Sequence, residues 1–124
     1  MTKRLKKSKK KVSESLRKLR EALDNPDNTN IFSYVDKYLK DNIRDASVET
    51  RQSQNDRATF IISKRCNDQI EFDHLKGYWS NVIYKILPSL RNKGFAFNDP
   101  SFNFKDEHMI ICQFGVAHAE QSLY

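Results

Sequence analysis

The chain has 124 residues, of which 38% are hydrophobic and 11% aromatic, and it carries a formal net charge of +6. Its length indicates one domain, and its eight Phe, five Tyr and one Trp are enough for a packed core without disulfides or metals. It contains three glycines and no P-loop, GxGxxG or nucleophile-elbow pattern, which argues against nucleotide hydrolysis, dinucleotide chemistry and a bound cofactor.

The positive charge is concentrated at the N-terminus. Residues 1–22 contain ten Lys or Arg and two Glu, whereas residues 23–124 contain twelve basic and fourteen acidic residues. We therefore divide the chain into a basic arm, residues 1–22, and a near-neutral α+β body, residues 23–124. Dense cations neutralise phosphates and bind polyanions in a salt-dependent way. The candidate nucleic-acid-binding residues are Lys3, Arg4, Lys6, Lys7, Lys9, Lys10, Lys11, Arg17, Lys18 and Arg20.

The end of the arm is expected to form an amphipathic helix over residues 13–23. Leu16, Leu19 and Leu23 recur at helical spacing and make a narrow apolar stripe. A helix this short is not stable alone in water, so it must pack on its own body or on another chain. Because the stripe suits a two-helix seam, we predict an interaction helix that contacts a second copy or a protein partner through these leucines.

A second helix is predicted over residues 30–44, after a turn at residues 25–28 that contains Pro26. Ile31, Val35 and Ile43 lie on its apolar side, so the two helices would form a helical hairpin. The stretch 46–57 contains one Val and no aromatic residue, and it is predicted to be a polar loop.

The second half is predicted to pack a small antiparallel sheet on one long helix. Residues 58–63 read as a strand and residues 69–72 as a short strand that pairs back. Asp73 would cap a helix from His74 to about Arg91, with Trp79 on its apolar stripe. Three more strands are expected at residues 95–97, 102–104 and 108–114, which completes an α+β fold.

The aromatic residues Phe95, Phe97, Phe102 and Phe104 allow two interpretations. They would stack on exposed bases if they faced solvent, or they would form core against the long helix. No Arg or Lys is interleaved between them, and Lys105 is the one nearby cation. We therefore expect these rings in the core.

The cysteines and histidines do not form a recognisable site. Cys66 and Cys112 stand at neither a CxxC nor a zinc spacing, and we expect free thiols in a reducing, cytoplasmic compartment, with a bridge between them as the alternative. His74, His108 and His118 would be the acid and base of a ribonuclease, but none lies in a known motif. No residues stand at metal-ligand spacing, and no apolar run is long enough for a membrane.

These patterns favour a small non-enzymatic accessory or regulatory protein that binds nucleic acid or a nucleoprotein through its arm. Lysine acts as a point charge, whereas arginine reads guanine edges bidentately, so the Lys-rich arm predicts sequence-nonspecific binding to DNA or RNA. A factor encoded by a mobile genetic element would fit the size and the lack of a catalytic motif. The alternatives are an adaptor or inhibitor subunit that docks through its N-terminal helix, and a small ribonuclease toxin.

Overall fold

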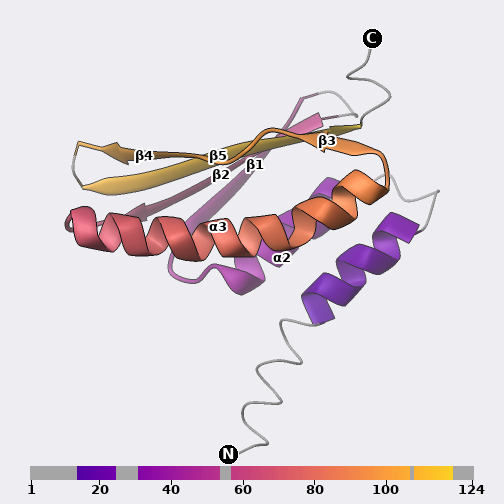
Figure 1. The fold of residues 1–124 in the computed structure, drawn as a ribbon, viewed down its shortest axis with the longest axis horizontal. Helices are drawn as coiled ribbons and strands as arrows, with labels where there is room; N and C mark the ends of the chain where they lie inside the picture. Colours follow the sequence, from indigo (N-terminus) through magenta and orange to yellow (C-terminus); the bar gives the residue numbers. More distant parts are fainter. Residues whose placement is uncertain (1–13, 25–30, 54–56, 107, 119–124) are drawn as a thin grey trace, which may run out of the picture.

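A computed structural model describes residues 14–24, 31–53, 57–106 and 108–118, and it confirms the α+β fold (Figure 1). Its first helix covers residues 14–24, close to the predicted 13–23, and is called the 14–24 helix below. The predicted turn at residues 25–28 and the arm before residue 14 lie outside the described residues. The other elements are α2 Ile31–Asn42, β1 Ser47–Ser53, β2 Arg57–Arg65, α3 Gln69–Asn92, β3 Phe95–Phe97, β4 Ser101–Lys105 and β5 Met109–His118.

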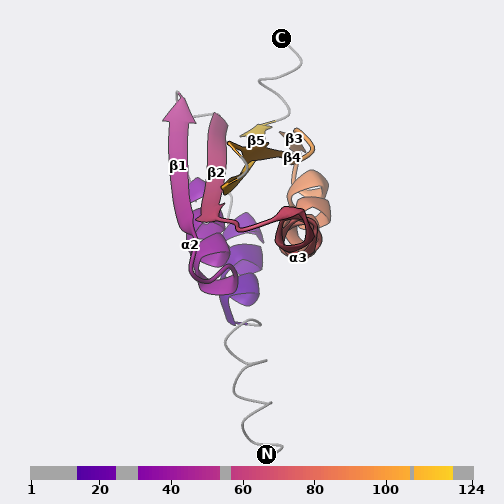
Figure 2. The ribbon, with the colours of Figure 1, turned by 90° about the vertical axis from the view of Figure 1, so that its left-hand side faces the viewer.

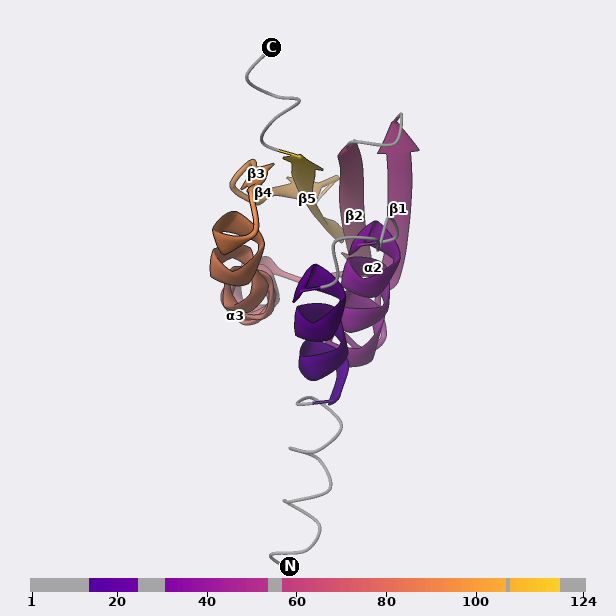
Figure 3. The ribbon, with the colours of Figure 1, turned by 90° about the vertical axis from the view of Figure 1, so that its right-hand side faces the viewer.

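The five strands form one antiparallel sheet with β5 near its centre. The order is β1-β2-β5, and both β3 and β4 pair with the far side of β5, β4 along its first half and β3 at its end. The 14–24 helix, α2 and α3 all lie on one face of this sheet (Figures 2 and 3). The described part of the molecule therefore has two layers, helices below and a sheet above in the orientation of Figure 1.

The core fills the space between the two layers. Phe60 of β2 and Phe114 of β5 are register partners whose rings stack at 5.1 Å, and Trp79 of α3 is buried beneath the sheet. The hydroxyl of Tyr38 donates to the carbonyl of Val82 at 2.8 Å, which joins α2 to α3. Burial and the neighbouring Tyr78 raise the pKa of Tyr38 to about 12, so this donor stays protonated at neutral pH.

The long helix α3 begins earlier than the sequence predicts. The Asp68 carboxylate accepts a hydrogen bond from the backbone N–H of Glu71 at 2.8 Å, so Asp68 and not Asp73 is the N-cap. The predicted strand at residues 69–72 is therefore wrong, because these residues form the first turn. Phe72 continues the helical stripe and stacks on Phe104 at 5.2 Å, a contact that a sequence pattern does not reveal.

The polar loop predicted at residues 46–57 is also wrong, because residues 47–53 form strand β1. All seven residues pair with β2 in an unbroken register. Val48 packs against the core, and the Thr50 hydroxyl donates to the carboxylate of Asp36 on α2 at 2.7 Å. A strand at the margin of a sheet buries little, so its composition is polar and resembles a loop.

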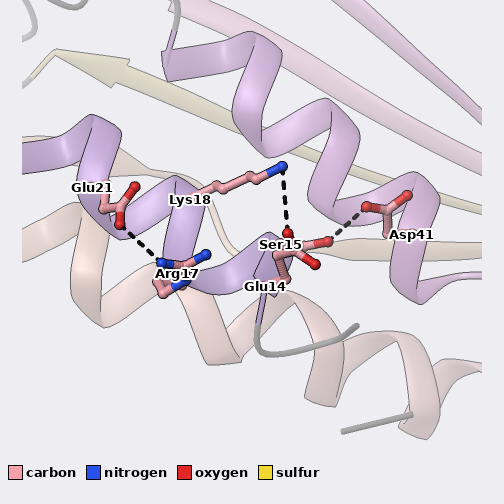
Figure 4. A network of polar contacts seen from close by, with 6 residues as sticks. All are labelled: Glu14, Ser15, Arg17, Lys18, Glu21 and Asp41. Carbon is pink, nitrogen blue, oxygen red and sulfur yellow. Dashed lines mark hydrogen bonds and ion pairs between the residues drawn. The ribbon is translucent and has the colours of Figure 1, made fainter. Parts of the chain in front are cut away.

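The 14–24 helix packs on the body of its own chain. Leu16 and Leu19 are buried in the core, with 8% and 0% of their surfaces exposed, and Leu23 is half-buried against it. Ser15 donates to Asp41 of α2 at 2.6 Å (Figure 4), and Lys93 lies 2.7 Å from Asp24. The predicted seam with another chain is therefore wrong at Leu16 and Leu19, because the core of the same chain already covers their apolar surfaces.

Candidate nucleic-acid interface

One face of the sheet points away from the described helices, and we call it the open face (Figure 1). On β2, Ala58, Phe60 and Ile62 are buried toward the helices. Because successive side chains of a strand point to opposite sides, the odd-numbered residues of β2, from Arg57 to Arg65, lie on the open face. The same alternation extends this face over β1, β4 and β5.

The charged residues on the described strands of the open face are four cations and one carboxylate. They are Arg51, Arg57, Arg65, Lys105 and Glu49, and all five are exposed. Glu49 forms an ion pair with Arg51 two positions along β1. The remaining three cations leave the face with a net positive charge.

The four cations form two pairs at opposite ends of the face. Arg51 lies opposite Thr59 on β2, so Arg57, two residues from Thr59, is its diagonal neighbour at about 7–8 Å. Arg65 and Lys105 flank Met109 in one row across three strands, and are therefore about 10 Å apart. Arg65 lies eight positions after Arg57 along β2, a span of about 27 Å. Duplex phosphates advance about 3.4 Å per base-pair step, so the face is about eight steps long.

The centre of the open face between these pairs carries small polar and aliphatic side chains. Ile61 and Ile111 are half-buried, and Thr59, Ser63 and Gln113 lie beside them on the same face. Aromatic rings on the described strands project to the helical side instead, as Phe60 and Phe114 show. A surface of cations and hydroxyls without rings suits phosphate contact and not base stacking.

The four open-face cations were not predicted as a site because they are dispersed along the sequence. A signal was present in β2, because Arg57 and Arg65 lie at the two ends of a strand and are eight positions, an even number, apart. Even spacing places two strand residues on one face. Arg51 was not recognised as a surface cation of the sheet because its segment was predicted to be a loop. Lys105 was not recognised because it was considered only as a neighbour of Phe104.

The structure describes only three of the ten basic residues predicted to bind nucleic acid. Lys3, Arg4, Lys6, Lys7, Lys9, Lys10 and Lys11 lie outside the described residues. Arg17, Lys18 and Arg20 are exposed on the 14–24 helix, on the opposite side of the sheet from the open face. The structure therefore does not bring these three residues together with the sheet cations.

The charges of the 14–24 helix balance one another (Figure 4). Arg17 lies 3.5 Å from Glu21, and Lys18 lies 3.8 Å from Glu14. A groove between this helix and α2 is lined by residues of both signs, among them Glu14, Lys18 and Asp41. Neither feature concentrates positive charge, whereas the described strands of the open face carry four cations and one carboxylate.

The histidines proposed for a ribonuclease do not all converge. His108 directly precedes β5 and His118 ends it, so about 33 Å of strand separates them. The ring of His118 lies 4.5 Å from that of Phe95, at the end of the strand. His108 and His118 therefore cannot act as one acid and base pair in this fold.

The phenylalanines of β3 and β4 pack toward the helices, as expected for core. Phe95 is buried, while Phe97, Phe102 and Phe104 are half-buried against the core. Cations from α3 cover two of these rings: the Lys76 ammonium lies 5.9 Å from the Phe102 centroid and the Arg91 guanidinium 5.6 Å from that of Phe97. These rings therefore have partners within the chain.

Both cysteines are buried free thiols. Burial raises the pKa of the Cys112 thiol to about 12, and burial also raises that of Cys66, whose Sγ donates to the carbonyl of Asp68 at 3.4 Å. The thiolate is the reactive form, so a raised pKa suppresses reaction at neutral and mildly alkaline pH.

We expect the native protein to resist thiol reagents at pH 8. A free thiol has a pKa near 8.5, so Cys112 should react about a thousandfold more slowly than a free cysteine. Measuring reaction with a chromogenic disulfide reagent, with and without denaturant, checks this. Both thiols should react rapidly once the chain unfolds, whereas rapid labelling of two thiols in the native protein would contradict the burial.

Within the residues that the structure describes, no group of three or more His, Cys, Asp or Glu side chains is arranged to hold a metal ion. Of the described helices, none combines the length and the apolar character needed to cross a membrane. Comparisons with protein-family models, curated proteins and solved structures found no match to this chain.

Proposed function

We propose that this protein is a non-enzymatic, sequence-nonspecific nucleic-acid-binding protein, an accessory or regulatory factor that contacts phosphates through its basic arm and its open face. The observation that carries this proposal is the open face itself, where four exposed cations stand against one carboxylate. The seven cations before residue 12 add to this charge. Each phosphate that the protein neutralises releases counterions, so binding should weaken steeply as salt rises.

The wide spacing of the cations on the face, and the absence of aromatic rings from the described strand residues that line it, support contact with the nucleic-acid backbone. These cations are about 27 Å apart from end to end along β2, and the residues between them offer hydroxyl and amide groups. Phosphate contacts position a protein without reading sequence. We therefore expect similar affinities for unrelated sequences of the same length and strandedness.

The experiment compares the parent chain with two variants of equal net charge. One replaces Arg57, Arg65 and Lys105 by Gln on the open face, and its control replaces Lys37, Arg44 and Lys85 by Gln on the helical side; all six residues are exposed. Fluorescence anisotropy with labelled DNA and RNA of two sequences, over a salt series, gives affinity and salt dependence. The open-face variant should lose about tenfold or more in affinity, and its salt slope should fall by about 2–3.

Deleting residues 1–11 tests the arm separately, and we expect a loss of about tenfold or more with the melting temperature almost unchanged. If the open-face variant and its helical-side control lose equal affinity, net charge alone explains binding and the face is not a site. A parent chain that binds neither DNA nor RNA at low salt would overturn the proposal and leave the adaptor alternative.

A further inference from the structure

We infer that strand β1 is a self-complementary edge through which two copies of this chain join their sheets. β1 stands at the margin of the sheet, where β2 is its neighbour on one side and no described strand pairs with the other (Figures 2 and 3). An unpaired edge presents backbone donors and acceptors that another strand can bind. The inference does not depend on nucleic-acid binding.

The edge of β1 is regular enough to accept a partner strand. Its seven residues follow an unbroken register with β2, and the sequence from Ser47 to Ser53 contains no proline. The opposite margin of the sheet differs, because it is divided into β3 and β4, of three and five residues, with Pro100 between them. Proline and interruptions are common protections of an edge, and β1 has neither.

The charges of β1 favour a second copy of the chain as its partner, and they favour one pairing register. When two β1 strands lie antiparallel about a two-fold axis at Thr50, Glu49 of each copy lies opposite Arg51 of the other. Both side chains are exposed on the open face, so this register forms two cross-strand pairs of opposite charge. A shift by two residues would place Glu49 opposite itself or Arg51 opposite itself, and a parallel in-register alignment would do both. Like charges directly opposite one another are destabilising.

The helical side of the edge is compatible with the same arrangement. Thr50 would lie at the axis, and its hydroxyl donates to Asp36 on α2, which lies 3.0 Å from Lys40. The Asp36 carboxylate that Thr50 contacts therefore has its own counter-ion. A groove between α2 and β1, lined by Ser33, Asp36 and Lys40 among others, remains on this side for the partner's side chains.

The pairing would join the two open faces into one surface. Each copy contributes its own Arg57, Arg65 and Lys105, while Glu49 and Arg51 neutralise one another at the junction. Such an isologous interface closes on itself, so it yields a dimer and not a fibre.

The test exploits the charge pattern with four forms of the full chain. Analytical ultracentrifugation over a concentration series compares the parent, Glu49→Arg, Arg51→Glu and the double swap of both. The single variants place like charges opposite one another twice, and their dimers should dissociate at least tenfold more readily than the parent dimer. The double swap restores opposite charges and should dimerise like the parent. Circular dichroism melts verify that every form is folded.

Mixing the two single variants gives the decisive measurement. In a Glu49→Arg copy both positions 49 and 51 are arginine, and in an Arg51→Glu copy both are glutamate. Opposite charges therefore face each other in the heterodimer, whereas like charges face each other in either homodimer. Native mass spectrometry of the mixture should show the heterodimer in excess over either homodimer. A parent that is monomeric at every concentration, single variants that dimerise as well as the parent, or a mixture without heterodimer would each overturn the inference.

Discussion

Replacing Trp79 by Ala should lower the free energy of unfolding by about 3–5 kcal/mol, as expected for removal of a buried aromatic side chain. Trp79 is 1% exposed and lies on the face of α3 that packs beneath the sheet, next to Ile83 and Ile86 along the same stripe. Alanine would leave a cavity that these neighbours fill only in part. The loss is a large share of the roughly 5–15 kcal/mol that stabilises a domain.

Urea unfolding followed by far-UV circular dichroism measures this loss, and Tyr84→Ala is the matched control. Tyr84 is an aromatic residue on the same helix, but it is 46% exposed and its hydroxyl donates to Asp99 at 3.2 Å. Its removal should cost less than about 1 kcal/mol. Equal losses for the two variants would mean that the sheet does not pack on the Trp79 face of α3.

Helical periodicity was the most reliable signal in this sequence. Ile31, Val35 and Ile43 were expected on one side of a helix, and all three are buried in the core. The stripe of the long helix was also recognised, and its predicted end near Arg91 lies close to the observed end at Asn92. Gly94 follows with a φ of 88°, a conformation that glycine adopts without strain. An amphipathic helix buries one whole side, so apolar residues recur in every turn of its sequence.

Strand β1 and the start of α3 could not be read from the sequence because tertiary contacts decide them. β1 buries little surface, and Val48 is its one clear hydrophobic residue. Its strand conformation depends on pairing with β2, which lies beyond a local pattern. Residues 69–72 have the alternation of a short strand, but the cap at Asp68 and the packing of Phe72 on Phe104 favour helix.

The sequence predicted a cation-rich site for a polyanion, but it did not predict that the open face carries such cations. The sequence indicated a polyanion partner from a run of cations, which is a property of composition. The open face requires the pairing of three strands to bring Arg65 and Lys105 into one row, and the register of β1 to place Arg51 near Arg57. Residues that are 40 positions apart converge only in the folded sheet, so no window of sequence contains this site.

The double substitution of Leu16 and Leu19 by Asp should abolish or severely weaken the native fold. Leu19 is fully buried and Leu16 is 8% exposed, and both belong to the core that also contains α2 and α3. Each Asp would remove apolar contacts and place a carboxylate among apolar neighbours. Leu→Ala alone costs about 2–5 kcal/mol at such positions, and a buried charge without a partner costs more. The loss should therefore approach the stability of the whole domain.

Thermal and urea melts of the double variant, beside Arg20→Asp as the control, measure this effect. Arg20 is exposed on the same helix, so its replacement by Asp introduces the same carboxylate in water and should leave the melt nearly unchanged. If the leucines served only a seam with another chain, the double variant would stay folded and change only its sedimentation. A folded variant that melts like the parent would thus show that the 14–24 helix is not core. Loss of the native transition, with Arg20→Asp unaffected, would show that the helix stabilises its own chain.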